Sequence, residues 1–203
     1  KKYLKWGLGT LAAVLLAGYG GLQYLLAQPE PEGFPILEYH MVQAEEPEDA
    51  YEYNVPVEDF RQQLDYLEEQ GYTTISIRDF LRAKKGLQEL PEKPVILTFD
   101  DGYNNNYTDL YPLLQKYNVK ATIFVIPSSV GGQYSMTAAQ IKEMADSGLV
   151  SIQSHTQDHK ELASLSADQQ KQQFAQSQLA IARMTGRIPS VLSYPSGSYD
   201  SNT

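Results

Sequence analysis

The chain has 203 residues, a net charge of −9 and no cysteine. The length fits one domain, alone or with an appendage, and the acidic balance excludes a general nucleic-acid-binding protein, which would carry the opposite charge. The missing cysteines exclude disulfide scaffolds, zinc ribbons and cysteine nucleophiles, and histidine chemistry is restricted to His40, His155 and His159.

Residues 1–28 form a basic and apolar leader. Three lysines within the first five residues precede an uncharged run over 6–29, and a helix of about 20 residues is long enough to cross the apolar core of a bilayer, about 30 Å thick. We therefore predict a membrane anchor whose lysine-rich end lies in the cytoplasm, with the rest of the chain outside the cytoplasm. The alternative is a cleaved signal peptide, which would make the protein secreted. Residues 29–35 are a short linker rich in proline and glutamate.

Strands and helices are predicted to alternate along the rest of the chain, with boundaries set by apolar periodicity and by glycine and proline. The predicted strands are 36–39, 72–77, 95–99, 121–126, 149–153 and 191–193. The predicted helices are 57–70, 78–85, 107–117, 137–147 and 166–185. Residues 40–56 are acidic and predicted to be irregular, and the glutamine-rich stretch 169–173 is interpreted as the polar face of its helix.

This alternation predicts an α/β fold with a mostly parallel sheet and right-handed crossovers. The predicted units amount to more than half of a (β/α) barrel. In such barrels the chemistry takes place where strands end and loops begin. Functional residues are therefore expected directly after predicted strands.

Two adjacent carboxylates, Asp100 and Asp101, follow the buried strand 95–99 within the segment TFDDGY. An Asp-Gly pair also occurs simply as a turn, which would explain Asp101 alone. A turn explains two carboxylates less well, because neighbouring negative charges at a strand end raise each other's pKa. The pair is thus a candidate for catalysis or metal binding.

His155 and His159 follow the strand 149–153, on the same predicted edge of the sheet. Four-residue spacing on a helical turn brings both rings to one side, although exposed loop histidines would show the same pattern. One aspartate and two histidines make a metal triad with positions open to water and substrate. The second aspartate remains free to act as a base, so the set predicts metal-assisted hydrolysis.

A third segment, 193–199, follows the last predicted strand and contains Pro-Ser-Gly, which is typical of a turn but could also present a backbone N–H to an oxyanion. The three segments, in this order, resemble the polysaccharide deacetylases of carbohydrate esterase family four. TFDDGY matches the first motif of that family, and SHTQDH, over 154–159, matches the second. The resemblance covers roughly 34–203 and implies a distorted (β/α) barrel domain over 36–203.

The resemblance implies a role for each candidate. Asp101, His155 and His159 would bind a divalent metal, usually Zn²⁺, although Co²⁺, Ni²⁺ and Fe²⁺ suit the same ligands. Asp100 would be the general base. Oxyanion and substrate would be bound by Ser196, through its backbone N–H, and by Tyr194, Pro195, Gly197 and Tyr103.

The start of the domain, ILEYH, resembles the exported branch of the family, which includes the poly-β-1,6-GlcNAc deacetylases of biofilm matrix. His40 would lie on the same edge of the sheet, either as a substrate contact or as a packing or surface histidine. The implied reaction removes N-acetyl groups from a GlcNAc-containing cell-surface polysaccharide, poly-GlcNAc or peptidoglycan, and releases acetate. The implied partners are this polysaccharide and the membrane, and the sequence indicates no nucleic-acid or protein partner.

The chain departs from the family pattern in two places. Ser193 and Ser196 stand where the third motif often carries an arginine that orients the base and an aromatic residue after the proline. The last two motifs, one with a histidine acting as general acid, do not occur before Thr203. We expect a fragment that lacks the last strands of the barrel, with a complete but degenerate member as the alternative. Two other functions stay open, a carbohydrate-binding pseudoenzyme and an O-acetyl esterase of the xylan type.

Overall fold

The computed structural model describes residues 33–44 and 53–203. The predicted leader 1–28 and most of the predicted linker lie outside the described residues. Within those residues, no helix combines the length and the apolarity needed to cross a bilayer. Residues Pro35–Thr203 make up a compact unit of their own.

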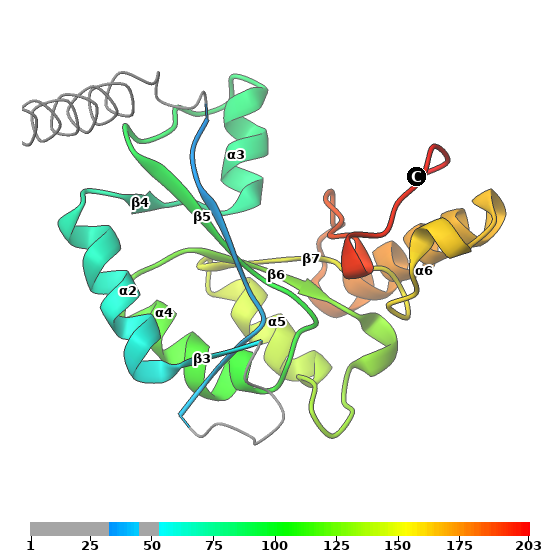
Figure 1. The fold of residues 1–203 in the computed structure, drawn as a ribbon, viewed down its shortest axis with the longest axis horizontal. Helices are drawn as coiled ribbons and strands as arrows, with labels where there is room; N and C mark the ends of the chain where they lie inside the picture. The colour runs from blue at the N-terminus through cyan, green and yellow to red at the C-terminus, as the bar shows by residue number, and fades with distance from the viewer. Residues whose placement is uncertain (1–32, 45–52) are drawn as a thin grey trace, which may run out of the picture. The chain divides into compact units, whose positions relative to one another are not determined.

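A parallel sheet forms the centre of this unit, with strands in the order β1, β5, β6, β7 (Figure 1). The bounds are Ile36–Tyr39 for β1, Pro94–Phe99 for β5, Ala121–Val125 for β6 and Val150–Ser154 for β7, and the short β4, Thr73–Thr74, pairs with the start of β5. β5 and β6 are buried along nearly their whole length because their continuous apolar runs are covered on both faces. A single bridge from Ser154 to Leu192 extends the sheet beyond β7. The predicted α/β class is confirmed, and closure into a barrel stays a prediction.

Helices α2, α4, α5 and α6 pack against this sheet, with α2, α4 and α5 along one side of it (Figure 1). Helix α3 is joined to β6 by a hydrogen bond from the Ile77 backbone N–H to the Thr122 hydroxyl. Their bounds are Val57–Glu69 for α2, Ile77–Lys84 for α3, Tyr111–Tyr117 for α4, Ala138–Asp146 for α5 and Ala167–Thr185 for α6. Capping boxes define the starts of α3, α5 and α6, where a serine or threonine side chain and the side chain three residues later each bond to the other's backbone N–H. The core includes the fully buried Phe60, Leu114, Ile141 and Ile181, one each from α2, α4, α5 and α6.

Three predicted segments differ from the structure. The strand predicted over 72–77 is limited to β4 because the Ser76 hydroxyl accepts the backbone N–H of Asp79, which starts α3 at Ile77. The strand predicted over 191–193 is reduced to the bridge at Leu192. The interval 40–56, predicted to be irregular, contains a parallel pair of short strands, β2 (Met41–Gln43) and β3 (Asn54–Pro56). Strands of three residues are too short for alternation to reveal them.

The interpretation of 169–173 as a polar face is wrong for two of its glutamines. Gln170 and Gln173 are buried, at 1% and 7% exposure, although Gln169 caps α6 as a surface residue. Spacings of three and four residues place Gln170, Gln173 and the buried Ser177 on one side of α6, which packs against β7. Burial of these polar groups is tolerated because each of them is hydrogen-bonded.

Removing the Asp79 carboxylate should destabilise the fold at neutral pH and matter less in acid. Its Oδ2 atom accepts the Ser76 backbone N–H at 3.0 Å, the Ser76 hydroxyl at 2.9 Å and the Lys120 ammonium at 2.9 Å. Burial pushes the pKa of Asp79 upward, but these donors outweigh burial and hold the pKa below its usual value. With the folded pKa below the unfolded one, the carboxylate stabilises the fold above the unfolded pKa. That contribution is lost as the pH falls through the folded pKa.

We therefore expect Asp79→Ala to lower the free energy of unfolding by about 1 kcal/mol at pH 7, and by less near pH 3. Urea unfolding at the two pH values measures both numbers. Asp65→Ala, which removes an exposed carboxylate from α2, is the matched control. A loss of equal size at both pH values would show that the ionised Asp79 carboxylate is not the source of the stabilisation.

The carboxyl ends of the parallel strands meet at one edge of the sheet. His40 follows β1, Asp100 and Asp101 follow β5, and His155 follows β7. Residues far apart in sequence are thereby brought to one place, as expected for parallel α/β sheets.

Candidate active site and metal centre

Asp101, His155 and His159 converge on one point. The Asp101 Oδ1 atom lies 3.4 Å from the Nε2 atom of His155 and 3.4 Å from the Nε2 atom of His159. The His155 side chain is buried, whereas the His159 side chain is 39% exposed. One ligand atom from each residue lies within 4.8 Å of the others. This is the triad that the sequence predicts.

The donor set fits a divalent metal. Among the described residues, the buried Asp101 Oδ1 atom has no hydrogen-bond partner. The His155 Nδ1–H donates to the Ser193 carbonyl at 3.0 Å, so its Nε2 atom keeps a lone pair directed at the same point. Burial lowers the pKa of His155 against the opposing effects of the Ser193 hydrogen bond and the Asp101 charge, and so favours the neutral imidazole that a metal requires. One carboxylate and two imidazoles match the ligands of catalytic zinc and related ions.

The backbone is unusual at this site. Five non-glycine residues in the described ranges have positive φ, and four of them lie here: Asp101, Thr156, His159 and Ser196, with φ of 71°, 63°, 58° and 54°. Left-handed backbone is unfavourable for residues with a Cβ atom and is found preferentially at functional sites. Gly102 has φ of 73°, and a Cβ atom there would lie 3.0 Å from the Val125 side chain, so β6 leaves no room for a larger residue.

Asp100 is buried beside the triad. Its Oδ2 atom accepts the Ser193 hydroxyl at 2.7 Å and lies 3.7 Å from the His155 Nε2 atom. Burial raises the pKa of Asp100 to about 6, against the opposing effect of the Ser193 hydrogen bond, and the nearby Glu38 carboxylate adds to the rise. A carboxylate with a pKa near neutrality is suited to accept and return a proton at physiological pH.

These residues line one cavity of about 680 Å³. Nine of the ten predicted site residues line its wall: His40, Asp100, Asp101, Tyr103, His155, His159, Tyr194, Ser196 and Gly197. The tenth, Pro195, is buried and does not line the cavity. Burial and the adjacent Asp101 raise the pKa of Tyr103 to about 12, so its phenol stays protonated and can donate a hydrogen bond.

His40 faces this cavity from the end of β1. Glu38, His40 and Asp100 each place a ligand-type atom within 4.8 Å of the other two. The His40 ring also packs against Tyr53, with 5.0 Å between ring centroids. His40 therefore lines the candidate site, and its role as a substrate contact stays a prediction.

Four lining residues were not among the predicted site residues. Glu38, Tyr53, Leu192 and Ser193 all line the cavity. Ser193 is the last residue of the predicted strand 191–193 and the first of the third candidate segment, which is a usable signal. By contrast, the place of Glu38 depends on the pairing of β1 with the distant β5, and that of Tyr53 on the short pair β2 and β3, which the sequence did not predict.

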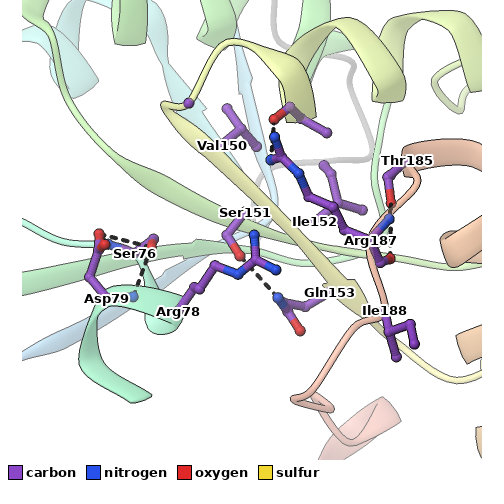
Figure 2. A pocket seen from close by; sticks show the side chains of 12 residues that line it. Ser76, Arg78, Asp79, Val150, Ser151, Ile152, Gln153, Thr185, Arg187 and Ile188 are labelled. Atoms are coloured by element: carbon purple, nitrogen blue, oxygen red, sulfur yellow. Dashed lines mark hydrogen bonds between the residues drawn. The ribbon is translucent and has the colours of Figure 1, made fainter. Parts of the chain in front are cut away.

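A smaller cavity, of about 250 Å³, lies apart from these residues (Figure 2). Its walls come from α3, β7 and the chain after α6, and its charged side chains are Arg78, Asp79 and Arg187. Figure 2 shows the hydrogen bond between the side chains of Ser76 and Asp79. The Arg187 guanidinium donates a hydrogen bond to the Ala145 carbonyl. No predicted site residue lines this cavity, so the candidate chemistry belongs to the larger one.

Comparison with known proteins agrees with this site. Residues 87–203 match the model of the family described as polysaccharide deacetylase. The chain is 38% identical over 174 residues to YxkH of Bacillus subtilis (strain 168), whose name assigns it to the polysaccharide deacetylases; the match covers 86% of this chain and 60% of YxkH. It is 34% identical over 148 residues to the poly-β-1,6-N-acetyl-D-glucosamine N-deacetylase of Escherichia coli (strain K12), covering 65% of this chain and 22% of that protein.

A solved structure, the Streptococcus pyogenes deacetylase PplD in complex with acetate, superposes with a TM-score of 0.77 at 32% identity and covers 85% of this chain and 78% of that one. The chain thus spans less than two thirds of the length of the two curated relatives. The family match extends over more than half of the 203 residues and includes all three segments that supply Asp101, His155 and Ser196. The chain therefore belongs to the polysaccharide deacetylase family.

Proposed function

We propose that this chain carries the catalytic site of a metal-dependent N-deacetylase, which hydrolyses N-acetyl groups of a GlcNAc-containing cell-surface polysaccharide and releases acetate. The observation that supports it most is the convergence of Asp101, His155 and His159 beside the buried Asp100 in one open cavity. The names of the Escherichia coli relative and of PplD point in the same direction.

Asp101, His155 and His159 would hold the metal. Zn²⁺ is our first choice, and Co²⁺, Ni²⁺ and Fe²⁺ are compatible with the same ligands. When bound, such an ion polarises the acetyl carbonyl and lowers the pKa of a bound water toward about 7. The ligand atoms lie at the cavity wall, so substrate and water have access to the same point.

Asp100 is the proposed general base. It takes a proton from the attacking water as the water oxygen bonds to the acetyl carbon. The Ser193 hydroxyl donates to this carboxylate and fixes its orientation. The backbone N–H of Ser196 is the proposed donor to the resulting oxyanion, in the turn Pro195–Gly197.

Cleavage of the amide C–N bond requires a proton on the departing amine. Asp100 can return the proton that it has taken from water, and His40 lies next to it with a ring nitrogen in the same cluster. We assign the delivery of the proton to His40, which gives its own proton to the amine and regains one from Asp100. His40 faces the cavity from the end of β1, the strand next to β5, whereas the triad histidines follow β7. The sugar would lie along Tyr194, whose ring stacks on that of the exposed Tyr199 at 5.4 Å between centroids.

Replacing His40 should affect amide substrates more than esters. We expect His40→Gln to lower kcat for N-acetyl substrates by about 100-fold, at the lower end of the range for general acid catalysis. An ester releases an alkoxide, which depends less on protonation, so O-acetyl substrates should lose much less. Acetate release from paired N-acetyl and O-acetyl sugars measures the ratio, with the ester serving as the internal control. Equal losses on both substrates would contradict proton delivery by His40.

The same assay separates the other functions. An O-acetyl esterase would release acetate from acetylated xylan faster than from poly-β-1,6-GlcNAc or chitooligosaccharides. A carbohydrate-binding pseudoenzyme would bind glycan and metal without turnover. Preference for the N-acetyl polymer, with turnover, is the result that our proposal predicts.

We also propose that the protein works outside the cytoplasm, anchored through residues 1–28. The support is the composition of that segment, with its lysines ahead of an uncharged run. Protease treatment of intact cells, followed by membrane fractionation, tests both parts. A protein that stays intact in protease-treated cells would contradict the location outside the cytoplasm. A protein found in the soluble fraction would contradict the anchor.

A further inference from the structure

A buried glutamine of α6 holds the loop that carries both histidine ligands. The Gln173 Oε1 atom accepts the backbone N–H of Gln157 at 3.0 Å and that of Asp158 at 3.2 Å. These two residues lie in the middle of the loop between His155 and His159. The amide is nearly inaccessible to water, so the two N–H groups depend on it rather than on solvent.

The backbone of this loop needs restraint. Thr156 and His159 both adopt left-handed backbone angles, which are unfavourable for residues with a Cβ atom. Such angles persist where the surrounding structure enforces them. The shape of the loop, and with it the position of the His159 ring, therefore depends on contacts made to its backbone.

Each backbone N–H group from 155 to 159 has an identifiable acceptor. The His155 N–H donates to the Val125 carbonyl of β6 at 2.9 Å. The N–H groups of Thr156 and His159 donate to nearby hydroxyls, Ser154 Oγ and Thr156 Oγ1, both at 3.1 Å. The start of the loop is thus fixed by the sheet and its end by a local turn. In the middle, the Gln157 carbonyl accepts the Ser128 backbone N–H at 3.1 Å, and the N–H groups of Gln157 and Asp158 donate to Gln173.

The two histidines are supported unequally. His155 is buried, and its Nδ1–H is bonded to the Ser193 carbonyl, so its ring is fixed independently of α6. His159 is more exposed, and its backbone bond is made within the loop itself. Loss of the Gln173 acceptor would therefore displace His159 before it displaced His155.

We propose that Gln173 is a positioning residue that sets the place of His159 for metal binding. The inference rests on the proposed role of Asp101, His155 and His159 as metal ligands. Gln173 acts through the backbone of the loop and does not contact the metal.

Gln173→Leu and Gln173→Glu form a matched pair of variants. Leucine fills similar space but accepts no hydrogen bond, whereas glutamate keeps an oxygen in the same place. We expect the leucine variant to bind Zn²⁺ about 10–100-fold more weakly than the wild type, the range found when a group that orients a metal ligand is removed. The glutamate variant should stay close to the wild-type affinity.

Gln170→Leu is the control for a purely structural role. Gln170 is buried on the same side of α6, but its amide donates to the carbonyls of Leu162 and Leu165 and to Asp200, outside the ligand loop. This variant should lose stability to urea and keep its Zn²⁺ affinity. Competition with a chromophoric chelator gives the affinities, and hydrogen exchange of the Gln157 and Asp158 amides in the wild type and the glutamate variant gives a readout that does not require the leucine variant to fold.

Weak Zn²⁺ binding in Gln173→Leu alone, together with slow exchange of the two amides in the wild type, would support the proposal. Wild-type affinity in folded Gln173→Leu, equal loss in Gln170→Leu, or fast exchange of both amides in the wild type would overturn it. A wild-type protein that takes up no Zn²⁺ would contradict the proposed function instead, which keeps the two failures apart.

Discussion

Asp100→Asn should lower kcat for acetate release by about 10²–10⁴-fold, the usual contribution of a general base, while metal binding is retained. Asparagine has almost the same shape, and its Oδ1 atom can accept the Ser193 hydroxyl as the carboxylate does. It cannot accept a proton from water. Because Asp100 is outside the triad of Asp101, His155 and His159, the metal ligands remain in place.

Two measurements on the same preparation check this expectation. Acetate release gives kcat, and elemental analysis gives the metal content per chain. Ser193→Ala is a useful companion, because it removes the hydroxyl that orients Asp100 but leaves the Ser193 carbonyl for His155. Ser193→Ala should lower kcat less than Asp100→Asn does. Wild-type kcat in Asp100→Asn would remove Asp100 from the role of base.

His155→Ala should abolish metal uptake at micromolar metal and, with it, acetate release. The variant deletes a ligand outright, so the loss of affinity should exceed the about 10–100-fold expected for groups that only orient a ligand. It also leaves the Asp101 Oδ1 atom, buried and without a hydrogen-bond partner among the described residues, with one potential partner fewer.

Because His155 is buried, its replacement could lower stability as well as affinity. His159→Ala avoids this difficulty, since the His159 side chain is partly exposed and its removal opens no core cavity. Both variants should lose the metal, and circular dichroism should show His159→Ala folded. Full metal occupancy in either folded variant would contradict the assignment of that histidine.

The candidate catalytic and metal-binding residues could be predicted from the sequence because of their positions relative to the strands. Asp100 and Asp101 directly follow a continuous apolar strand, and His155 directly follows another. Parallel strands bring such positions to one edge of a sheet. This reasoning needs local patterns only. The resemblance of the two segments to known motifs then supplied specific roles for the four side chains.

Contacts across the sheet could not be predicted in the same way. The bond from Ser193 to Asp100 joins residues 93 positions apart and depends on how the chain after α6 meets β7. The burial of Gln173 was missed because glutamine at that spacing is also typical of a solvent-facing helix surface. Its role depends on the two N–H groups of a loop that packs against α6, which no pattern within the helix records.

Acetate release from a β-1,6-linked GlcNAc oligosaccharide, measured against metal content, tests the central claim most directly. We predict that release falls to background when a chelator removes the metal and returns in proportion as Zn²⁺ refills the site, up to one ion per chain. Release that continues undiminished in protein shown to be metal-free would contradict the account.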